Sequence, residues 1–373
     1  MVENGLNKCN AGSDGGPIMG PHPVVRVLLE RARTGSRPGA RTDPHRVALV
    51  IEGGAMRGVV SGGMVAALEA LGLRQAFDVV YGASAGACAG AYFLAGQARA
   101  GARLYYEVVN TRRFINLLRG FQRRAIVDLD YLFDEVLSRR LPLDFAEIER
   151  SGVELVLLAS HVDGQASASG SPQVEAVRLA GFQDVDDLLG ALHASSRLPV
   201  IGGEPFAYRG LRYWDAAITQ PIPIHAALAD GCTHVLVLLT LPRDTRPGRL
   251  GLLDRLLVAP RVAATSPSLA WVYRTRSDRY RETCQLIFEG TQSREGPPFV
   301  DGIAADAATP VIGRTEIRAQ RLVAAARAGG DAILAAFGRS DARLNAHLLA
   351  ENVQGHVVDV RIGTIPGPAA SPA

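Results

Sequence analysis

Two strand–turn–helix units near the start of the chain constrain its fold more than any other feature. Residues 46–51 read RVALVI and stop at a glycine cluster, and residues 58–71 then place apolar side chains at helical spacing. Residues 77–81 (FDVVY) predict a second strand, which is followed by a turn at 82–86 and a small-residue helix. Short apolar, β-branched runs are typical of strands buried on both faces. Their alternation with helices predicts a three-layer α/β/α sandwich with a mainly parallel sheet.

The remaining segments predict one large domain with a tail at each end. Further buried strands are expected at 154–160 and 233–241, and an Ala-rich helix or helix pair at 315–337. We expect residues 46–337 to form the domain, with a core at 46–245 and a connector with a C-terminal helical extension at 246–337. Residues 1–45, rich in Gly, Pro, Arg and Asn, predict a mostly disordered head with a short helix near 23–33. Residues 338–373 are expected to be a tail.

The basic residues exclude several kinds of chemistry. Forty basic against 37 acidic residues give a net charge of +3, which is too even to suggest a nucleic-acid partner. Lys8 is the only lysine, so a Schiff-base lysine, a P-loop lysine, a kinase lysine and a Ser–Lys dyad are excluded. Catalysis would have to use hydroxyls, carboxylates, histidines, arginines or backbone amides.

Cysteine spacing and hydropathy bear on compartment, metals and membranes. The four cysteines are far apart, which favours a reducing cytoplasm and predicts neither a zinc site nor a disulfide framework (Cys9, Cys88, Cys232 and Cys284). Residues 79–98 carry no charge and are long enough to span a bilayer. Their high Gly and Ala content favours a buried strand–turn–helix instead.

Residues 82–86 read Gly82-Ala83-Ser84-Ala85-Gly86, a G-x-S-x-G pentapeptide between a predicted strand and a predicted helix. A serine on so sharp a turn projects from the backbone, and the flanking glycines avoid clashes. The helix that follows directs its amides and its positive dipole end toward an anion formed there. A tight turn with a capping serine is the simpler alternative.

A second glycine-rich turn follows the first predicted strand, at Gly53-Gly54-Ala55-Met56-Arg57-Gly58. Small residues let the backbone turn and expose successive N–H groups to an oxyanion or a phosphate. No Lys-Ser/Thr pair follows, and the dinucleotide glycine pattern is out of register. An oxyanion hole is the remaining chemical use, and a plain connecting turn is the alternative.

Together these two segments resemble the patatin-like phospholipase family, in its bacterial branch. The resemblance covers residues 46–337 and includes EGGAMRG, DLDYLFDEVL, the Ala194-Ser195-Ser196 segment and Tyr213-Trp214-Asp215-Ala216-Ala217. It implies hydrolysis of a lipid or carboxylic ester through an acyl-enzyme, without a cofactor or a metal. Ser84 would be the nucleophile and Asp215 the general base.

The resemblance also implies roles for the residues around this dyad. Gly82 and Gly86 would form the nucleophile elbow, and Ala216 and Ala217 would belong to the base motif. The oxyanion hole would come from the glycine loop (Gly53, Gly54, Ala55, Met56, Arg57 and Gly58). Arg57 would contact an anionic headgroup or pair within the structure.

The chain departs from the family pattern at Ala55 and Ala216, where glycine is usual. A positive φ at either position would cost alanine about 1 kcal/mol. A degenerate member that binds lipid or a partner without turnover is therefore an alternative function. A Ser-His-Asp hydrolase is a second alternative, with four downstream histidines to supply the base (His225, His234, His347 and His356).

Three arginine pairs follow the second unit, at 112–113, 123–124 and 139–140. A solvated face is the default interpretation. Attachment to anionic lipid is the alternative, so that a cytoplasmic protein would contact the inner membrane face peripherally. Four aromatic residues nearby are expected in the core (Tyr105, Tyr106, Phe114 and Phe121).

Overall fold

A central mixed sheet forms the middle layer of the computed structural model, which describes residues 21–122, 124–162, 176–243, 245, 254–309 and 311–339. Within these residues the sheet has eight strands in the order β5-β6-β3-β2-β1-β7-β8, with β4 also paired to β3. Five strands are mutually parallel: β1 (Val47–Ile51), β2 (Val79–Ala83), β3 (Glu154–His161), β7 (His234–Leu239) and β8 (Phe299–Ala304). The antiparallel ones are β4 (Val177–Leu179), β5 (Phe206–Tyr208) and β6 (Leu211–Asp215).

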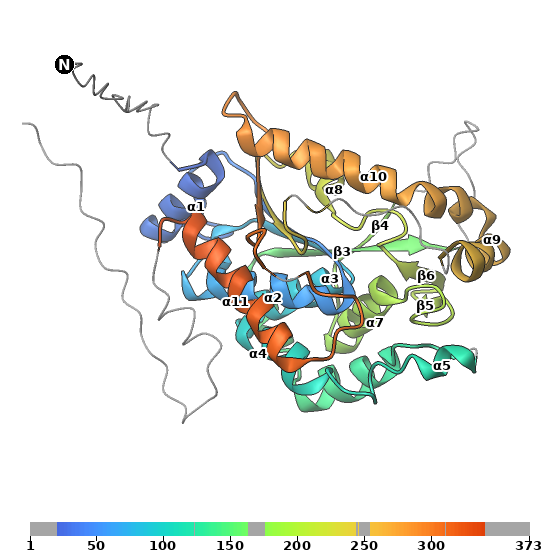
Figure 1. Ribbon diagram of the computed structural model, residues 1–373. Coiled ribbons are helices and arrows are strands. Elements are labelled where there is room, and N and C mark those ends of the chain that lie inside the picture. The colour runs from blue at the N-terminus through green and yellow to red at the C-terminus, as the bar shows by residue number, and fades with distance from the viewer. Residues whose placement is uncertain are drawn as a thin grey trace, which may run out of the picture.

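Helices cover both faces of the sheet, which Figure 1 shows nearly edge-on. One face carries α2 (Gly58–Ala70), α3 (Ala85–Leu94), α4 (Ala98–Arg103), α7 (Val185–Ser196) and α11 (Ala319–Ala336). The other carries α8 (Ile224–Ala229) and α10 (Pro267–Gln292). The remaining α-helices are α1 (Pro23–Thr34), α5 (Leu118–Phe121), α6 (Phe145–Ser151) and α9 (Ala259–Thr265). There are also π-helical segments at Leu104–Val108, Tyr131–Arg140 and Asp254–Val258, and 3₁₀ turns at Ala55–Arg57 and Arg74–Ala76. The predicted α/β/α sandwich is confirmed.

The C-terminal part of the chain contributes more than the predicted helical extension. Strand β8 pairs in parallel with β7 and extends the sheet, with Val300 beside Val235. Asp301 and Gly302 interrupt the apolar run of this strand, which is why the sequence pattern did not reveal it. Residues 340–373, most of the predicted tail, lie outside the described residues.

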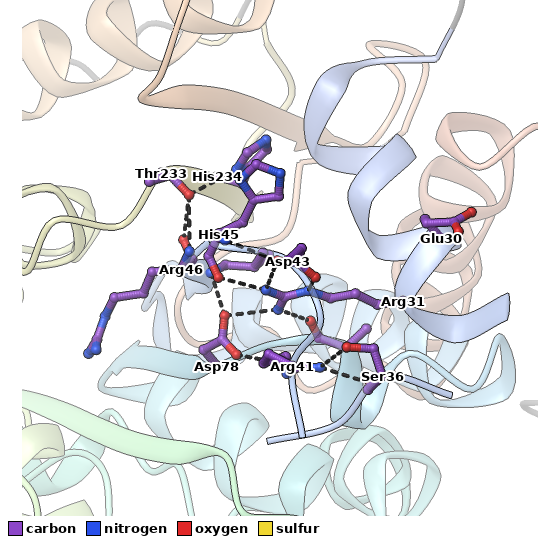
Figure 2. A network of polar contacts seen from close by, with 12 residues as sticks. Glu30, Arg31, Ser36, Arg41, Asp43, His45, Arg46, Asp78, Thr233 and His234 are labelled. Atoms are coloured by element: carbon purple, nitrogen blue, oxygen red, sulfur yellow. Dashed lines mark hydrogen bonds and ion pairs between the residues drawn. The ribbon is translucent and has the colours of Figure 1, made fainter. Parts of the chain in front are cut away.

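An ion-pair network fixes α1 at the N-terminal edge of the parallel strands (Figure 2). The Arg31 guanidinium is buried and lies between Asp43 and Asp78, at 2.7 and 2.8 Å. Arg41 also donates to Asp78, and the Val47 amide donates to the same carboxylate at 2.7 Å. The helix expected near residues 23–33 is therefore α1, and it is packed into the domain. The described part of the predicted disordered head, residues 21–45, is ordered and belongs to the fold.

Helix α11 lies directly against α2 because two glycines allow their backbones to touch. A Cβ on Gly63 would stand 1.9 Å from the Ala326 carbonyl oxygen, and one on Gly329 would stand 2.2 Å from the Val60 carbonyl oxygen. This contact holds the C-terminal helix against the helix that follows the glycine loop. Residues 79–98 form β2 and α3, as predicted, and none of the helices in the described ranges has the length and hydropathy needed to cross a bilayer.

Candidate active site

The β2–α3 connection places Ser84 on a strained turn. Its backbone has φ 53° and ψ −124°, a conformation that costs a non-glycine residue about 1–3 kcal/mol. The flanking glycines are required sterically. A Cβ on Gly82 would lie 2.5 Å from Ala87 Cα, and one on Gly86 would lie 2.4 Å from the Ile51 carbonyl oxygen. The pentapeptide therefore forms an elbow pressed against the end of β1, with Ser84 at the N-terminus of α3.

The glycine loop after β1 supplies two available amides beside this serine. Among the described residues, the N–H groups of Gly54 and Ala55 meet no hydrogen-bond acceptor. The other four predicted amides are already bonded, those of Gly53, Met56, Arg57 and Gly58 donating to carbonyl oxygens of Pro221, Arg314, Gly54 and Ala55 respectively. The structure thus narrows the candidate oxyanion hole to two donors.

The two alanines that replace family glycines differ in their backbone strain. Ala55 has φ 51°, which lies in the left-handed region and costs an L-residue about 1–2 kcal/mol. Ala55 nonetheless lines the same cavity as Ser84. Ala216 does not have a positive φ, so alanine is accommodated there without strain.

Asp215 ends β6 and is fully buried. Its Oδ1 accepts the Ala217 N–H at 2.7 Å, whereas Oδ2 has no hydrogen-bond partner within the described chain. Burial raises the pKa of Asp215 to about 6, and the Ala217 amide, the Ser84 hydroxyl and Arg314 oppose that increase. Ser84 is therefore close enough to influence the carboxylate, although its position does not satisfy Oδ2. Catalytic hydrogen bonds are often long before substrate binds.

Ser195, near the end of α7, holds the elbow in place. Its hydroxyl accepts the Ser84 N–H at 2.9 Å and donates to the Leu158 carbonyl at 2.6 Å. Both contacts are buried. The sequence pointed to Ser195 only through the family resemblance and assigned it no role.

Glu52 is a further buried residue that the sequence reasoning did not single out. Its carboxylate accepts the Thr240 N–H at 2.5 Å and the Tyr280 hydroxyl at 2.7 Å. These contacts join the start of the glycine loop to the end of β7 and to α10. In the sequence, the feature that could have identified Glu52 is its position as an acidic residue directly between the apolar run at 46–51 and the glycine loop.

Ser84 lies where two cavities of different character meet. The first has mainly apolar walls, including Leu104, Phe114, Ile115 and Leu132. The second is lined by polar groups that include Glu52, Arg57, Asp215, Arg276, Tyr280 and Arg314. Ala55, Ser84, Leu198 and Arg314 line both cavities.

Tyr105, Tyr106 and Phe114 are buried as predicted, while the side chain of Phe121 lies outside the described part.

None of the histidines in the described residues lines either of these two cavities. His234 begins β7 and pairs with Val47, so it is at the opposite end of the strands from Ser84. His225 is exposed on α8, within 3.3 Å of the Thr283 hydroxyl. His347 and His356 lie outside the described residues. No group of three potential metal ligands occurs in the part of the chain that the structure describes.

Three comparisons with known proteins found similar sequences or structures. Residues 49–228 match the model of the patatin-like phospholipase family. The protein YjjU of Escherichia coli strain K12 is 27% identical over 202 residues, which cover 53% of this chain and 53% of that protein. The chain therefore aligns with about half the length of that relative. The crystal structure of VipD from Legionella pneumophila aligns with a TM-score of 0.33 and 11% identity, over 79% of this chain and 67% of that chain.

The family match over residues 49–228 and the fold place the protein in a class, the α/β/α proteins with a patatin-like domain. More particularly, residues 49–228 are a domain of the patatin-like phospholipase family, which is a family of lipid hydrolases.

Proposed function

We propose that the protein hydrolyses a carboxylic ester of a lipid, with Ser84 as nucleophile and Asp215 as general base. One observation carries this proposal: a serine on a strained elbow lies between an apolar cavity and a polar one, and a buried carboxylate lines the polar cavity beside it. An ester with a long acyl chain and a polar remainder matches that division.

The proposed reaction has two halves. Ser84 Oγ attacks the ester carbonyl carbon while its proton passes to Asp215, and the N–H groups of Gly54 and Ala55 stabilise the oxyanion. Collapse of the tetrahedral intermediate breaks the ester bond, and the leaving alcohol takes the proton from Asp215. Water then attacks the acyl-enzyme, gives its proton to Asp215 and releases the fatty acid as Ser84 recovers its proton.

Burial of Asp215 supports its role as a base. An ordinary aspartate, with a pKa near 3.9, is a weak base toward an alcohol. The raised pKa of about 6 brings Asp215 closer to neutral pH, where a general base works best. Its free Oδ2 is the atom available to receive the serine proton.

The polar cavity would hold the part of the lipid that leaves. Arg57, Arg276 and Arg314 line it, and forked guanidinium groups suit a phosphate or another oxyanion. The Nε of Arg57 is buried and meets no acceptor among the described residues. We therefore favour an anionic headgroup over a neutral one.

The proposal is tested by hydrolysis of short-chain and phospholipid esters by wild type and four variants. Ser84→Ala and Asp215→Asn should each lose at least a hundredfold in kcat/KM, whereas His225→Gln and His234→Gln should retain activity. Activity that survives in Ser84→Ala would contradict the proposal. Complete loss in either histidine variant would favour the triad instead.

A lipid-binding protein without turnover is the alternative, and the left-handed Ala55 favours it. In that case neither an ester nor a fluorophosphonate would react with wild type, while a fatty acid or lysolipid would still bind. Binding of a fluorescent fatty acid in the absence of any hydrolysis would establish this second function.

A further inference from the structure

The segment formed by residues 111–124 is unusual in both charge and exposure. It reads TRRFINLLRGFQRR, with five arginines and no acidic residue, and it includes the short helix α5. Leu117 and Leu118 expose 60% and 67% of their surface, at a point where the chain could have placed polar residues. Single exposed leucines are common on protein surfaces. Two adjacent ones among five arginines are not accounted for by a solvated basic face.

The inner side of the same segment belongs to the apolar cavity. Phe114 and Ile115 are buried and line the cavity that reaches Ser84. The segment is anchored by backbone bonds from the Asn116 N–H to the Ile126 carbonyl and from the Asp128 N–H to the Phe114 carbonyl, both at 2.9 Å. The segment that carries the exposed leucines therefore also lines the proposed acyl site.

The charges around the leucines leave a positive excess. Arg113 pairs with Glu135, and Arg119 pairs with Asp128 at 3.4 Å. Arg112 and Arg124 are exposed and form no ion pair within the described residues. Asp130 is bonded to Arg197 at 2.5 Å.

Other exposed leucines lie at the same end of the molecule as this segment. Figure 1 shows α5 at the end toward which β3 points, together with the β5–β6 hairpin and α9. Two other exposed leucines belong to the same end, Leu211 at the start of β6 and Leu256 just before α9. Helix α1 lies at the opposite end.

We propose that Arg112, Leu117, Leu118 and Arg124 form a surface that binds anionic lipid bilayers, which we call the arginine–leucine surface. The leucines would enter the interface while the arginines contact acidic headgroups. An acyl chain leaving the bilayer there passes along Phe114 and Ile115 into the cavity at Ser84. This inference rests on the proposed lipid substrate and names the membrane from which that substrate is taken.

Binding is tested in the full chain carrying Ser84→Ala, so that hydrolysis does not alter the lipid. The probe is a vesicle of phosphatidylcholine with roughly one-third phosphatidylglycerol, and binding is measured by co-sedimentation. Leu117→Ser with Leu118→Ser should weaken binding about tenfold or more. Arg112→Gln with Arg124→Gln should weaken vesicle binding roughly 25-fold at low salt, because each arginine near an anionic surface contributes about fivefold to the affinity. High salt should reduce this second difference, because it screens surface charges.

Matched controls separate this surface from general effects of charge and hydropathy. Trp271→Ser removes another exposed apolar side chain, half exposed on α10. Arg33→Gln with Arg37→Gln removes two exposed arginines at and just beyond the end of α1, at the other end of the molecule. Both controls should bind vesicles as well as the parent does. Equal binding by the leucine pair and the controls would overturn the inference, as would equal binding to pure phosphatidylcholine vesicles.

A second assay distinguishes failure of this inference from failure of the proposed function. With Ser84 intact, Leu117→Ser with Leu118→Ser should hydrolyse a water-soluble short-chain ester at the wild-type rate and vesicle phospholipid about tenfold more slowly. Undiminished hydrolysis of vesicle phospholipid would overturn the surface and leave the function in place. Vesicle binding that depends on the leucines, without hydrolysis of either ester by wild type, would overturn the function and leave the surface in place.

Discussion

Replacing Asp215 by asparagine should stabilise the protein while it removes activity. The side chain is fully buried, and burial raises its pKa from 3.8 to about 6. The difference of about two units corresponds to about 3 kcal/mol at 1.36 kcal/mol per unit. Asparagine keeps the Oδ1 acceptor for the Ala217 N–H and removes the charge.

The size of this stabilisation depends on pH. Well below pH 4 the carboxyl is protonated in both the folded and the unfolded chain, so the charge has no cost. As pH rises, the unfolded chain releases the proton first, and the folded state loses stability until pH passes about 6. Asp215→Asn should therefore match wild type near pH 4 and exceed it by about 3 kcal/mol at pH 8, on the order of 5 °C in Tm.

The assay is urea unfolding of both proteins at the two pH values. Asp301→Asn is a matched control, because burial also raises the pKa of Asp301 to about 6 while this residue lies on β8 within 3.7 Å of His22. Asp301→Asn should show a similar dependence on pH and keep its activity. Equal stability differences at pH 4 and pH 8, or a less stable Asp215→Asn at pH 8, would refute the reasoning.

Three further predictions concern the same site. In wild type, kcat/KM should fall roughly tenfold between pH 7 and pH 5, because the ionised fraction of a group with a pKa of about 6 falls from about 0.9 to about 0.1. A flat pH–rate profile over this range would argue against Asp215 as the base. Ser195→Ala leaves the Ser84 N–H and the Leu158 carbonyl buried and unpaired. The variant should therefore lose at least tenfold in kcat with little change in KM, and its free energy of unfolding should fall by about 2–5 kcal/mol. An unchanged kcat would show that Ser195 does not position Ser84. Ala55→Gly removes the backbone strain of an alanine in the left-handed region. It should raise the free energy of unfolding by about 0.5–1 kcal/mol without loss of activity. A variant that is less stable than wild type in urea unfolding would show that the turn is not strained.

Much of the core sheet could be predicted because its strands carry a strong local pattern. The runs at β1, β2, β3 and β7 are apolar, short and bounded by turn residues, and each lies within a few residues of its predicted range. Strand β8 could not be found in this way, since Asp301 and Gly302 break its pattern and only its pairing with β7 defines it. The order at 21–45 was also missed, because the buried Arg31 looks in sequence like any surface arginine.

The candidate site shows a similar division between local and tertiary information. The elbow is local, and the clashes at Gly82 and Gly86 explain why the pentapeptide has its glycines. The contacts of Ser195 with Ser84 and of Glu52 with Tyr280 join residues more than a hundred positions apart. Spacing along one sequence carries no information on such pairs, so these two supporting residues emerge only from the fold.

The central claim is that Ser84 is a nucleophile activated at this site, and covalent labelling tests it most directly. Wild type treated with a fluorophosphonate should gain one adduct mass, located by peptide mass spectrometry to the peptide containing Ser84. Ser84→Ala should gain none, and Asp215→Asn should label at least tenfold more slowly. Labelling of a different residue, or equal labelling of wild type and Ser84→Ala, would contradict the account.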